Sequence, residues 1–440
     1  MRFTARACLW AAVLSLFPAR AFGAKLDLNL DYRLRGRSYK NVELSPSGGG
    51  IQAFFSHQAS LGFAIKNIEL DGARGKAQTM DVALSLKALG IAGSTTPVRA
   101  PFDRIADRYP NSNFIPWIQN AYIKFHNVRA WEMTFGQQPF RLGSGFLLSD
   151  DGLGFMGFSA QRSLPWKNIK TQLFFFSPRP DQAGSENIDL FGAYFQIPTE
   201  GVWQFSLLRE HDRHSPSAVG VALNKAVKNY LSMGYSLEHR QFAFDGEFAA
   251  VRGKSSPSAA GSSDMTIIGH ALMVKGSWKQ DLGRFGSGTA RLTFGRGSGD
   301  NPNTADKDES FLPSFGHRFD GLDRSGIGEF YAASLYDARA STSTFNGLPA
   351  GASGLSIVGI GLSLPPWRDV HMDLDYYLYQ ASRSTTGNRS LGKEWDFRLR
   401  YNVKDKLTLQ ASISLFRSGL LLGPGEFTAR KYFLEVSGRF

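Results

Sequence analysis

The chain ends in Tyr432-Phe433-Leu434-Glu435-Val436-Ser437-Gly438-Arg439-Phe440, and this stretch decides the fold. Tyr432, Leu434, Val436 and Phe440 fall on alternate positions, and the chain stops on the aromatic Phe440. Glu435, Ser437 and Arg439 lie on the other face. Alternation of this kind places one face of a strand against lipid and the other face in an aqueous lumen. A terminal strand of this form is typical of bacterial outer-membrane β-barrels.

Residues 1–23 have the form of a secretory signal peptide. Two arginines precede an apolar run over residues 7–17 that is too short to span a bilayer. Small residues stand where a signal peptidase requires them, so the mature chain is predicted to begin at Ala24. Cys8, the single cysteine, lies inside this segment. The mature chain therefore has no thiol for a disulfide, a metal site or a lipid anchor.

The composition argues against a helical membrane protein. Mean hydropathy is −0.22, and no segment after residue 23 has the 18 uninterrupted apolar residues that a spanning helix needs. Aromatic residues nevertheless make up 13% of the chain, as expected when lipid-facing and lumen-facing positions alternate. The net charge is +12, and three of the arginines that contribute to it lie in the signal peptide. Such an excess suits a nucleic-acid binder or a pore for anions, and export from the cytoplasm argues against nucleic acid.

Alternating segments recur along the chain. Over residues 25–35, leucines and a tyrosine occupy one face, and charged or amide side chains occupy the other. The same pattern returns at residues 370–378 and 395–403, and in a milder form at residues 407–415. A soluble sheet does not commonly keep so many charged positions opposite so many large apolar ones. We therefore expect an all-β protein, a transmembrane antiparallel β-barrel whose strands run throughout residues 24–440.

The connections between these segments fall into two classes, as the asymmetry of such barrels requires. Short turns are predicted at 126–128, 165–168, 198–200, 239–241, 281–283, 365–369 and 404–406, with a longer connection at 66–78. Long polar loops are predicted at 37–50, 92–114, 140–156, 178–187, 212–225, 253–263, 297–352, 383–391 and 419–426. Nine loops and eight turns give 18 strands, with both termini in the periplasm. The segment Ile327–Leu335 resembles a strand, but counting it would make the number odd, so it is assigned to the long extracellular loop 297–352 as a helix or a short hairpin.

One part of the chain resembles a known family. Residues 116–152 contain a strand with an Ala-Tyr-Ile core, an aromatic strand ending in Gly-x-Gln, and a Gly-Ser-Gly turn. Residues 311–317 add a Phe-Leu-Pro-Ser-Phe-Gly-His sequence in a long loop. These motifs resemble the alginate-export family of outer-membrane porins, although that family tends to have Gly-Arg-Gln where this chain has Gly136-Gln137-Gln138. The resemblance implies an 18-stranded barrel that carries an acidic polysaccharide outward through an electropositive constriction.

Passage of an anion requires basic side chains on the inward faces of the strands. These side chains must bind the solute weakly enough to release it. Arginine suits this role because its planar fork pairs with carboxylates and stays charged. Arg398 and Arg400 are the strongest candidates for the constriction because they lie mid-strand. The alternative is structural cross-strand pairing, in which Arg400 lies opposite Asp373 or Asp375. The predicted pore-lining or substrate-binding residues are Asp31, Arg33, Arg35, Lys124, Arg291, Asp373, Asp375, Arg398, Arg400 and Lys431.

Three functions remain open from the sequence. The first is a pore that exports an anionic polysaccharide or passes another anionic solute, and the second is a general or substrate-specific porin for uptake of small anionic nutrients. The third is an outer-membrane enzyme or adhesin, which is disfavoured because no nucleophile motif appears and most loops are modest. We therefore expect no catalytic residues, no metal and no cofactor. The expected partners are outer-membrane lipid, the barrel-assembly machinery and the anionic solute, around a monomer.

Overall fold

The protein is described here from a computed structural model. The described residues are 24–41, 44, 50–70, 78–93, 113–150, 152, 154–165, 168–178, 188–213, 225–256, 264–315, 327–332, 334–338, 346–403, 406–423 and 425–440. The predicted signal peptide at 1–23 lies outside them.

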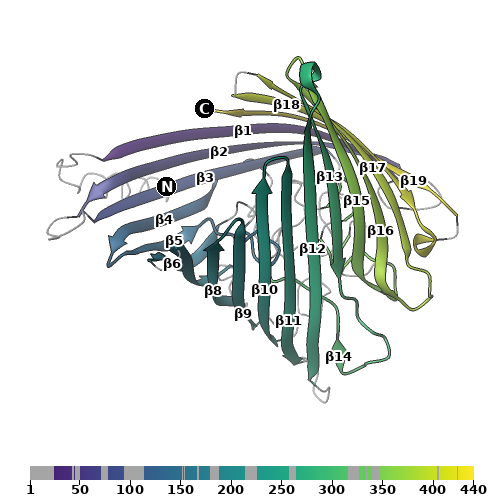
Figure 1. Cartoon of the computed structure of the whole chain (residues 1–440), viewed down its shortest axis with the longest axis horizontal. Helices are drawn as coiled ribbons and strands as arrows, with labels where there is room; N and C mark the ends of the chain where they lie inside the picture. The colour runs from purple at the N-terminus through teal and green to yellow at the C-terminus, as the bar shows by residue number, and fades with distance from the viewer. Residues whose placement is uncertain are drawn as a thin grey trace, which may run out of the picture.

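Eighteen long strands form one closed antiparallel barrel, which confirms the predicted fold class and strand count. Each strand pairs with its neighbours in sequence, and the first strand, β1, also pairs with the last, β19, to close the ring. Figure 1 follows this wall from β1 in purple to β19 in yellow. One further strand, β14, has only two residues and lies parallel to β12 at the edge of the wall. The segment Ile327–Leu335 is not a wall strand, as predicted.

The strands of the first half are Lys25–Lys40 (β1), Ile51–Glu69 (β2), Thr79–Gly93 (β3), Trp117–Val128 (β4), Trp131–Gln138 (β5), Phe155–Leu164 (β6), Ile169–Ser177 (β7), Ile188–Pro198 (β8), Val202–Asp212 (β9) and Lys225–His239 (β10). Those of the second half are Phe242–Ser256 (β11), Met265–Asp281 (β12), Ser287–Gly297 (β13), Lys307–Asp308 (β14), Ala352–Trp367 (β15), Val370–Ser384 (β16), Ser390–Val403 (β17), Leu407–Ser418 (β18) and Thr428–Arg439 (β19). Two short 3-10 helices occur at Gly283–Phe285 and Leu420–Leu422.

The alternation in the sequence becomes the two faces of this wall. On β1, Leu26 and Leu28 are 62% and 60% exposed on the outer surface, and the charged residues between them face the lumen. The same outward band continues around the barrel, for example at Leu292 on β13 and Trp395 on β17. A continuous apolar belt of this size belongs in a bilayer. Among the described residues, no helix is long and apolar enough to cross a membrane.

Short turns join the strands at one end of the barrel and long loops join them at the other, in the order predicted. The prediction of a loop at 37–50 was wrong at its start, because β1 continues to Lys40. The inward side chains of Arg37 and Tyr39 are buried there, so contacts inside the barrel extend the strand past the point where the sequence turns polar. The loop predicted at 140–156 ends two residues earlier, because β6 begins at Phe155.

Two of the long loops fold into the lumen and pack on each other. The connection between β5 and β6, residues 139–154, contributes Leu147 and Leu148, both fully buried. The connection between β13 and β15, residues 298–351, contributes Phe315, whose backbone accepts a hydrogen bond from Ser149 N at 2.7 Å and donates one to Leu147 O at 3.2 Å. Phe146 stacks on Phe311 across the same contact. The two loops therefore make an apolar core inside the barrel that narrows its lumen.

Candidate functional site

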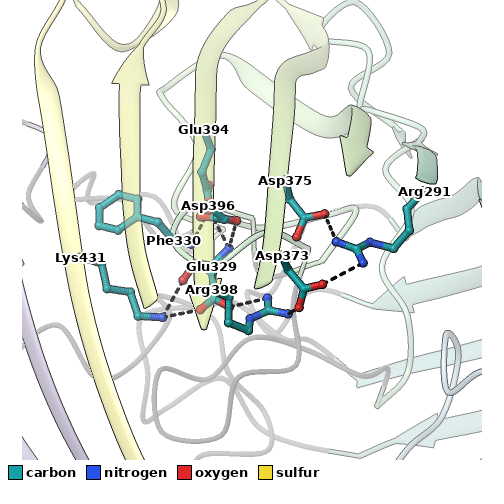
Figure 2. A network of polar contacts seen from close by, with 9 residues as sticks. All are labelled: Arg291, Glu329, Phe330, Asp373, Asp375, Glu394, Asp396, Arg398 and Lys431. Atoms are coloured by element: carbon teal, nitrogen blue, oxygen red, sulfur yellow. Dashed lines mark hydrogen bonds and ion pairs between the residues drawn. The ribbon is translucent and has the colours of Figure 1, made fainter. Parts of the chain in front are cut away.

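The tip of the 298–351 loop is held against the inner face of β17. The carboxylate of Glu394 accepts hydrogen bonds from the backbone N–H groups of Glu329 (2.6 Å), Phe330 (2.7 Å) and Tyr331 (3.0 Å). Asp396 accepts a further bond from the N–H of Glu329 at 2.9 Å. Figure 2 shows both wall carboxylates pointing at the loop. Successive N–H groups form a concave anion-binding surface, and here the wall itself supplies the anions.

The local sequence of the tip allows this close approach. Gly328 adopts φ +77°, a conformation that favours glycine, and a Cβ there would collide with the hydroxyl of Tyr379 and crowd the carboxylate of Glu394. The Tyr379 hydroxyl itself donates to Glu394 at 2.9 Å. Gly328 is therefore the residue that lets the backbone reach the wall.

Aromatic packing completes the contact between the tip and the wall. Phe330 lies between Tyr39 on β1 and Phe416 on β18, with ring centroids 6.3 and 5.8 Å away. Tyr331 stacks on Phe416 at 4.5 Å and is fully buried. Burial raises the pKa of the Tyr331 phenol far above its usual range, so this ring packs as a neutral group.

The side chain of Glu329 is the acid that the loop places in the lumen. Its carboxylate accepts a hydrogen bond from Arg398 Nη2 on β17 at 2.7 Å and another from Lys431 Nζ on β19 at 3.1 Å. Lys431 also donates to the backbone oxygen of Glu329 at 2.8 Å. Glu329 and Lys431 are almost completely buried, with 1% and 2% of their side chains exposed. The two predicted pore cations therefore face a loop residue that sequence reasoning left out of the site.

A chain of alternating charges continues from this cluster along the wall (Figure 2). Arg398 Nη1 lies 3.6 Å from Asp373 Oδ2 on β16. Arg291 on β13 then bridges Asp373 at 3.1 Å and Asp375 at 2.9 Å. Structural pairing thus accounts for Arg291, Arg398 and both aspartates, in agreement with the alternative that the sequence left open.

Arg400 behaves differently from Arg398. The predicted register was wrong, because Arg400 lies opposite His371, and it is Arg398 that lies opposite Asp373. Among the residues that the structure describes, the side chain of Arg400 makes no ion pair or hydrogen bond, and neither does the side chain of Lys275 on β12. Both side chains line the lumen, so they are cations available to a solute.

Two recesses beside the loop tip share Arg398 and Arg400. The larger, of about 520 Å³, lies over β12, β13 and β15 to β17, and the smaller, of about 200 Å³, lies over β1 and β17 to β19. Seven basic and four acidic side chains line them, so the walls carry an excess of positive charge. These side chains are Arg35, Arg37, Lys275, Arg291, Arg398, Arg400, Lys431, Glu329, Asp373, Asp375 and Glu435.

The remaining predicted residues lie at the barrel seam or on another part of the wall. Arg35 pairs with Glu435 across the β1–β19 seam, within the smaller recess. Asp31 pairs with Arg33 at 3.0 Å and with Arg439 at 3.1 Å. Lys124 pairs with Glu132 on the neighbouring strand at 2.7 Å, outside both recesses. The structure thus gathers seven of the ten predicted residues at the recesses, and Asp31, Arg33 and Lys124 are not among them.

Sequence reasoning missed Glu329, Lys275 and Arg37 as parts of this site. Lys275 and Arg37 lie in strands whose side chains alternate between lipid and lumen. Their inward direction could therefore have been predicted from their positions in the sequence. Glu329 lies in the strand-like segment Ile327–Leu335 of a polar loop. That pattern indicated that the segment is buried, but it did not indicate which part of the barrel the segment contacts. Within the described part of the chain, no group of three His, Cys, Asp or Glu side chains could hold a metal ion.

The fold and the site together define a porin-type barrel, with an apolar outer belt, two inward loops and a charged, narrowed lumen. No protein-family model matches the sequence, and no curated protein matches it either. Solved structures match over nearly the whole chain. OccAB4 of Acinetobacter baumannii matches 94% of this chain and 98% of its own with a TM-score of 0.57 at 11% identity.

Two proteins of Pseudomonas aeruginosa match in the same way. OccK2 (OpdF) covers 95% of this chain and 99% of its own, with a TM-score of 0.56 at 13% identity. OpdK, solved with vanillate, covers 94% and 98%, with a TM-score of 0.53 at 14% identity. OpdK is described as an outer membrane protein, and the predicted outer-membrane barrel fold is confirmed by this likeness.

The predicted resemblance to alginate-export proteins was wrong. Structures that match the chain from end to end include the Occ-type porins OccAB4 and OccK2. The motifs at residues 116–152 and 311–317 carried the resemblance, and parts of them that the structure describes have local roles. Residues 311–315 pack the inward loop against residues 146–149. Short aromatic and glycine motifs of this kind serve the packing of a barrel interior and do not identify what passes through it.

Proposed function

We propose that this protein is a substrate-selective porin of the bacterial outer membrane that admits small anionic solutes of the carboxylate class. The lumen is narrowed by two packed loops, which suits a small solute better than a polymer. The excess of basic side chains at the recesses would attract anions, and focusing by the surrounding low-dielectric wall strengthens that attraction. The proposed role is passive passage, with no catalytic step.

The observation that carries this proposal is the unpaired state of Arg400. Its neighbour Arg398 is neutralised by Glu329 and Asp373, whereas Arg400 lines both recesses and has no partner within the described residues. A guanidinium in that position can pair with a carboxylate through two parallel hydrogen bonds. The matched porin OpdK was solved with vanillate, an aromatic carboxylate, which supports the same class of solute here.

The proposal can be tested by permeability measurements in proteoliposomes. We expect the wild-type protein to pass benzoate faster than benzylammonium, a cation of similar size. Arg400→Ala should remove most of this difference. Lys66→Ala is the matched control, because it removes one positive charge from a pair with Asp27 near the end of the barrel. Equal rates for the two solutes in the wild type, or no effect of Arg400→Ala, would overturn the proposal.

A further inference from the structure

Arg398 and Lys431 together form a binding site for one carboxylate, and that of Glu329 fills it. Arg398 Nη2 lies 2.7 Å from one oxygen of Glu329, and Lys431 Nζ lies 3.1 Å from the other. All three side chains are largely shielded from solvent. A planar guanidinium and an ammonium that grip the two oxygens of a carboxylate would hold the same group on any molecule.

The backbone of Glu329 is held by contacts that do not involve its side chain. Glu394 and Asp396 accept its N–H at 2.6 and 2.9 Å, and Glu394 also binds the next two N–H groups. The ring of Phe330 adds its packing against the wall. The loop tip can therefore stay in place when the side chain at position 329 is changed.

The filled site opens toward the path proposed for the solute. Arg398 lines both recesses beside Arg400, and Lys431 and Glu329 line the smaller one. A solute carboxylate at Arg400 would thus lie next to a second, stronger carboxylate site that is already occupied. Conduction requires binding that is weak enough to release the solute.

We propose that Glu329 is a tethered competitor, a carboxylate of the protein that occupies the Arg398–Lys431 site and prevents solute carboxylates from binding there tightly. This inference rests on the proposed function and adds to it a residue that sets affinity. The solute contacts Arg400 in passing, while Glu329 occupies the adjacent pair of cations, Arg398 and Lys431. The site that Glu329 fills takes small monocarboxylates.

The test is block of single-channel current by benzoate in planar bilayers. Glu329→Gln removes the charge by which the side chain competes for Arg398 and Lys431, so a benzoate carboxylate can displace the neutral amide. The half-blocking concentration of benzoate should fall by at least about tenfold, or about 1.4 kcal/mol. Glu309→Gln is the control, since it removes a carboxylate from the same loop at a position that makes no ion pair among the described residues. The double variant with Glu329→Gln and Arg398→Gln restores the wild-type net charge and should lose the tight block.

An unchanged half-blocking concentration in Glu329→Gln would overturn the inference, as would an equal fall in Glu309→Gln or tight block in the double variant. If Glu329→Gln does not assemble, Glu329→Asp decides, because it keeps the charge and withdraws the carboxylate by one methylene. It should tighten the block, and an unchanged value would again overturn the inference. Failure of the proposed function looks different, since benzoate would then show no preferential passage through the wild-type channel.

Discussion

Glu394 on β17 accepts a hydrogen bond from the backbone N–H of Phe330 at 2.7 Å, so a fully buried carboxylate of the wall holds the tip of the long inward loop. The same carboxylate binds the N–H groups on either side of Phe330. This contact fixes the position of Glu329, and through it the pairing of Arg398 and Lys431. The geometry of the narrowed lumen therefore depends on one acidic side chain of the barrel.

Replacing Glu394 by alanine should release the loop tip. The buried N–H groups of Phe330 and Tyr331 would lose their acceptor, at a cost of about 1–3 kcal/mol each, and that of Glu329 would keep only Asp396. The tip should therefore leave the wall. We expect higher single-channel conductance in planar bilayers, with more frequent current fluctuations. Glu132→Gln is the control, a wall carboxylate that pairs with Lys124 on a neighbouring strand. Conductance equal to that of the wild type would show that Glu394 does not hold the constriction.

A second variant tests the close approach of the loop. Gly328→Ala places a methyl group against Tyr379 and Glu394 and also strains a backbone at φ +77°. Gly387 in the β16–β17 turn has the same φ, with nothing within 4 Å of the position of a Cβ. Gly387→Ala therefore reports only the cost of the left-handed backbone conformation, about 1–2 kcal/mol. We expect raised conductance in Gly328→Ala only, and the idea fails if both variants conduct alike.

Deleting residues 300–350 should remove most of the inward plug. The deletion takes away Phe311, Phe315 and Glu329 and exposes the apolar face of the 139–154 loop. We expect a large rise in conductance. We also expect the permeabilities of chloride and of larger organic anions to become more similar than they are in the wild type. A channel with unchanged conductance would contradict the placement of this loop inside the lumen.

The last residue should matter for closing the barrel. Phe440 exchanges two backbone hydrogen bonds with Leu30 on β1, at 3.0 and 2.9 Å, which complete the seam. Deletion of Phe440 removes both bonds, at about 1 kcal/mol each, together with the terminal aromatic ring. A smaller fraction of heat-modifiable, folded barrel is expected in outer-membrane fractions. Phe440→Tyr keeps the ring and the backbone, and it should assemble like the wild type.

Alternation along the sequence was enough to predict the wall of the barrel. On β1 and β19 the apolar positions are determined by contact with lipid, which acts on each strand separately and therefore appears in the local pattern. The register of a hairpin depends on its turn. The last pair of the β16–β17 ladder is Gln380 with Ser390, and a bulge follows at Tyr379. The turn of this hairpin is centred near residue 385, earlier in the sequence than the predicted pairing requires, and this places Arg400 opposite His371 and not opposite the predicted aspartates.

The interior of the lumen could not be predicted in the same way. Glu329 meets Arg398 and Lys431 only because a long loop folds back across several strands, and no local pattern encodes that return. The strand-like segment at Ile327–Leu335 did indicate burial. Its apolar residues pack inside the barrel among Tyr39, Tyr379 and Phe416, where the sequence alone offered a helix or a short hairpin.

The claim that the lumen selects anions is tested most directly by the reversal potential of single wild-type channels under a KCl gradient. The basic side chains around Arg400 and Lys275 outnumber the acids of the recesses, so we predict a reversal potential with the sign of chloride permeation. It should move toward zero in Arg400→Ala. A wild-type reversal potential at zero, or one with the sign of potassium permeation, would contradict the account.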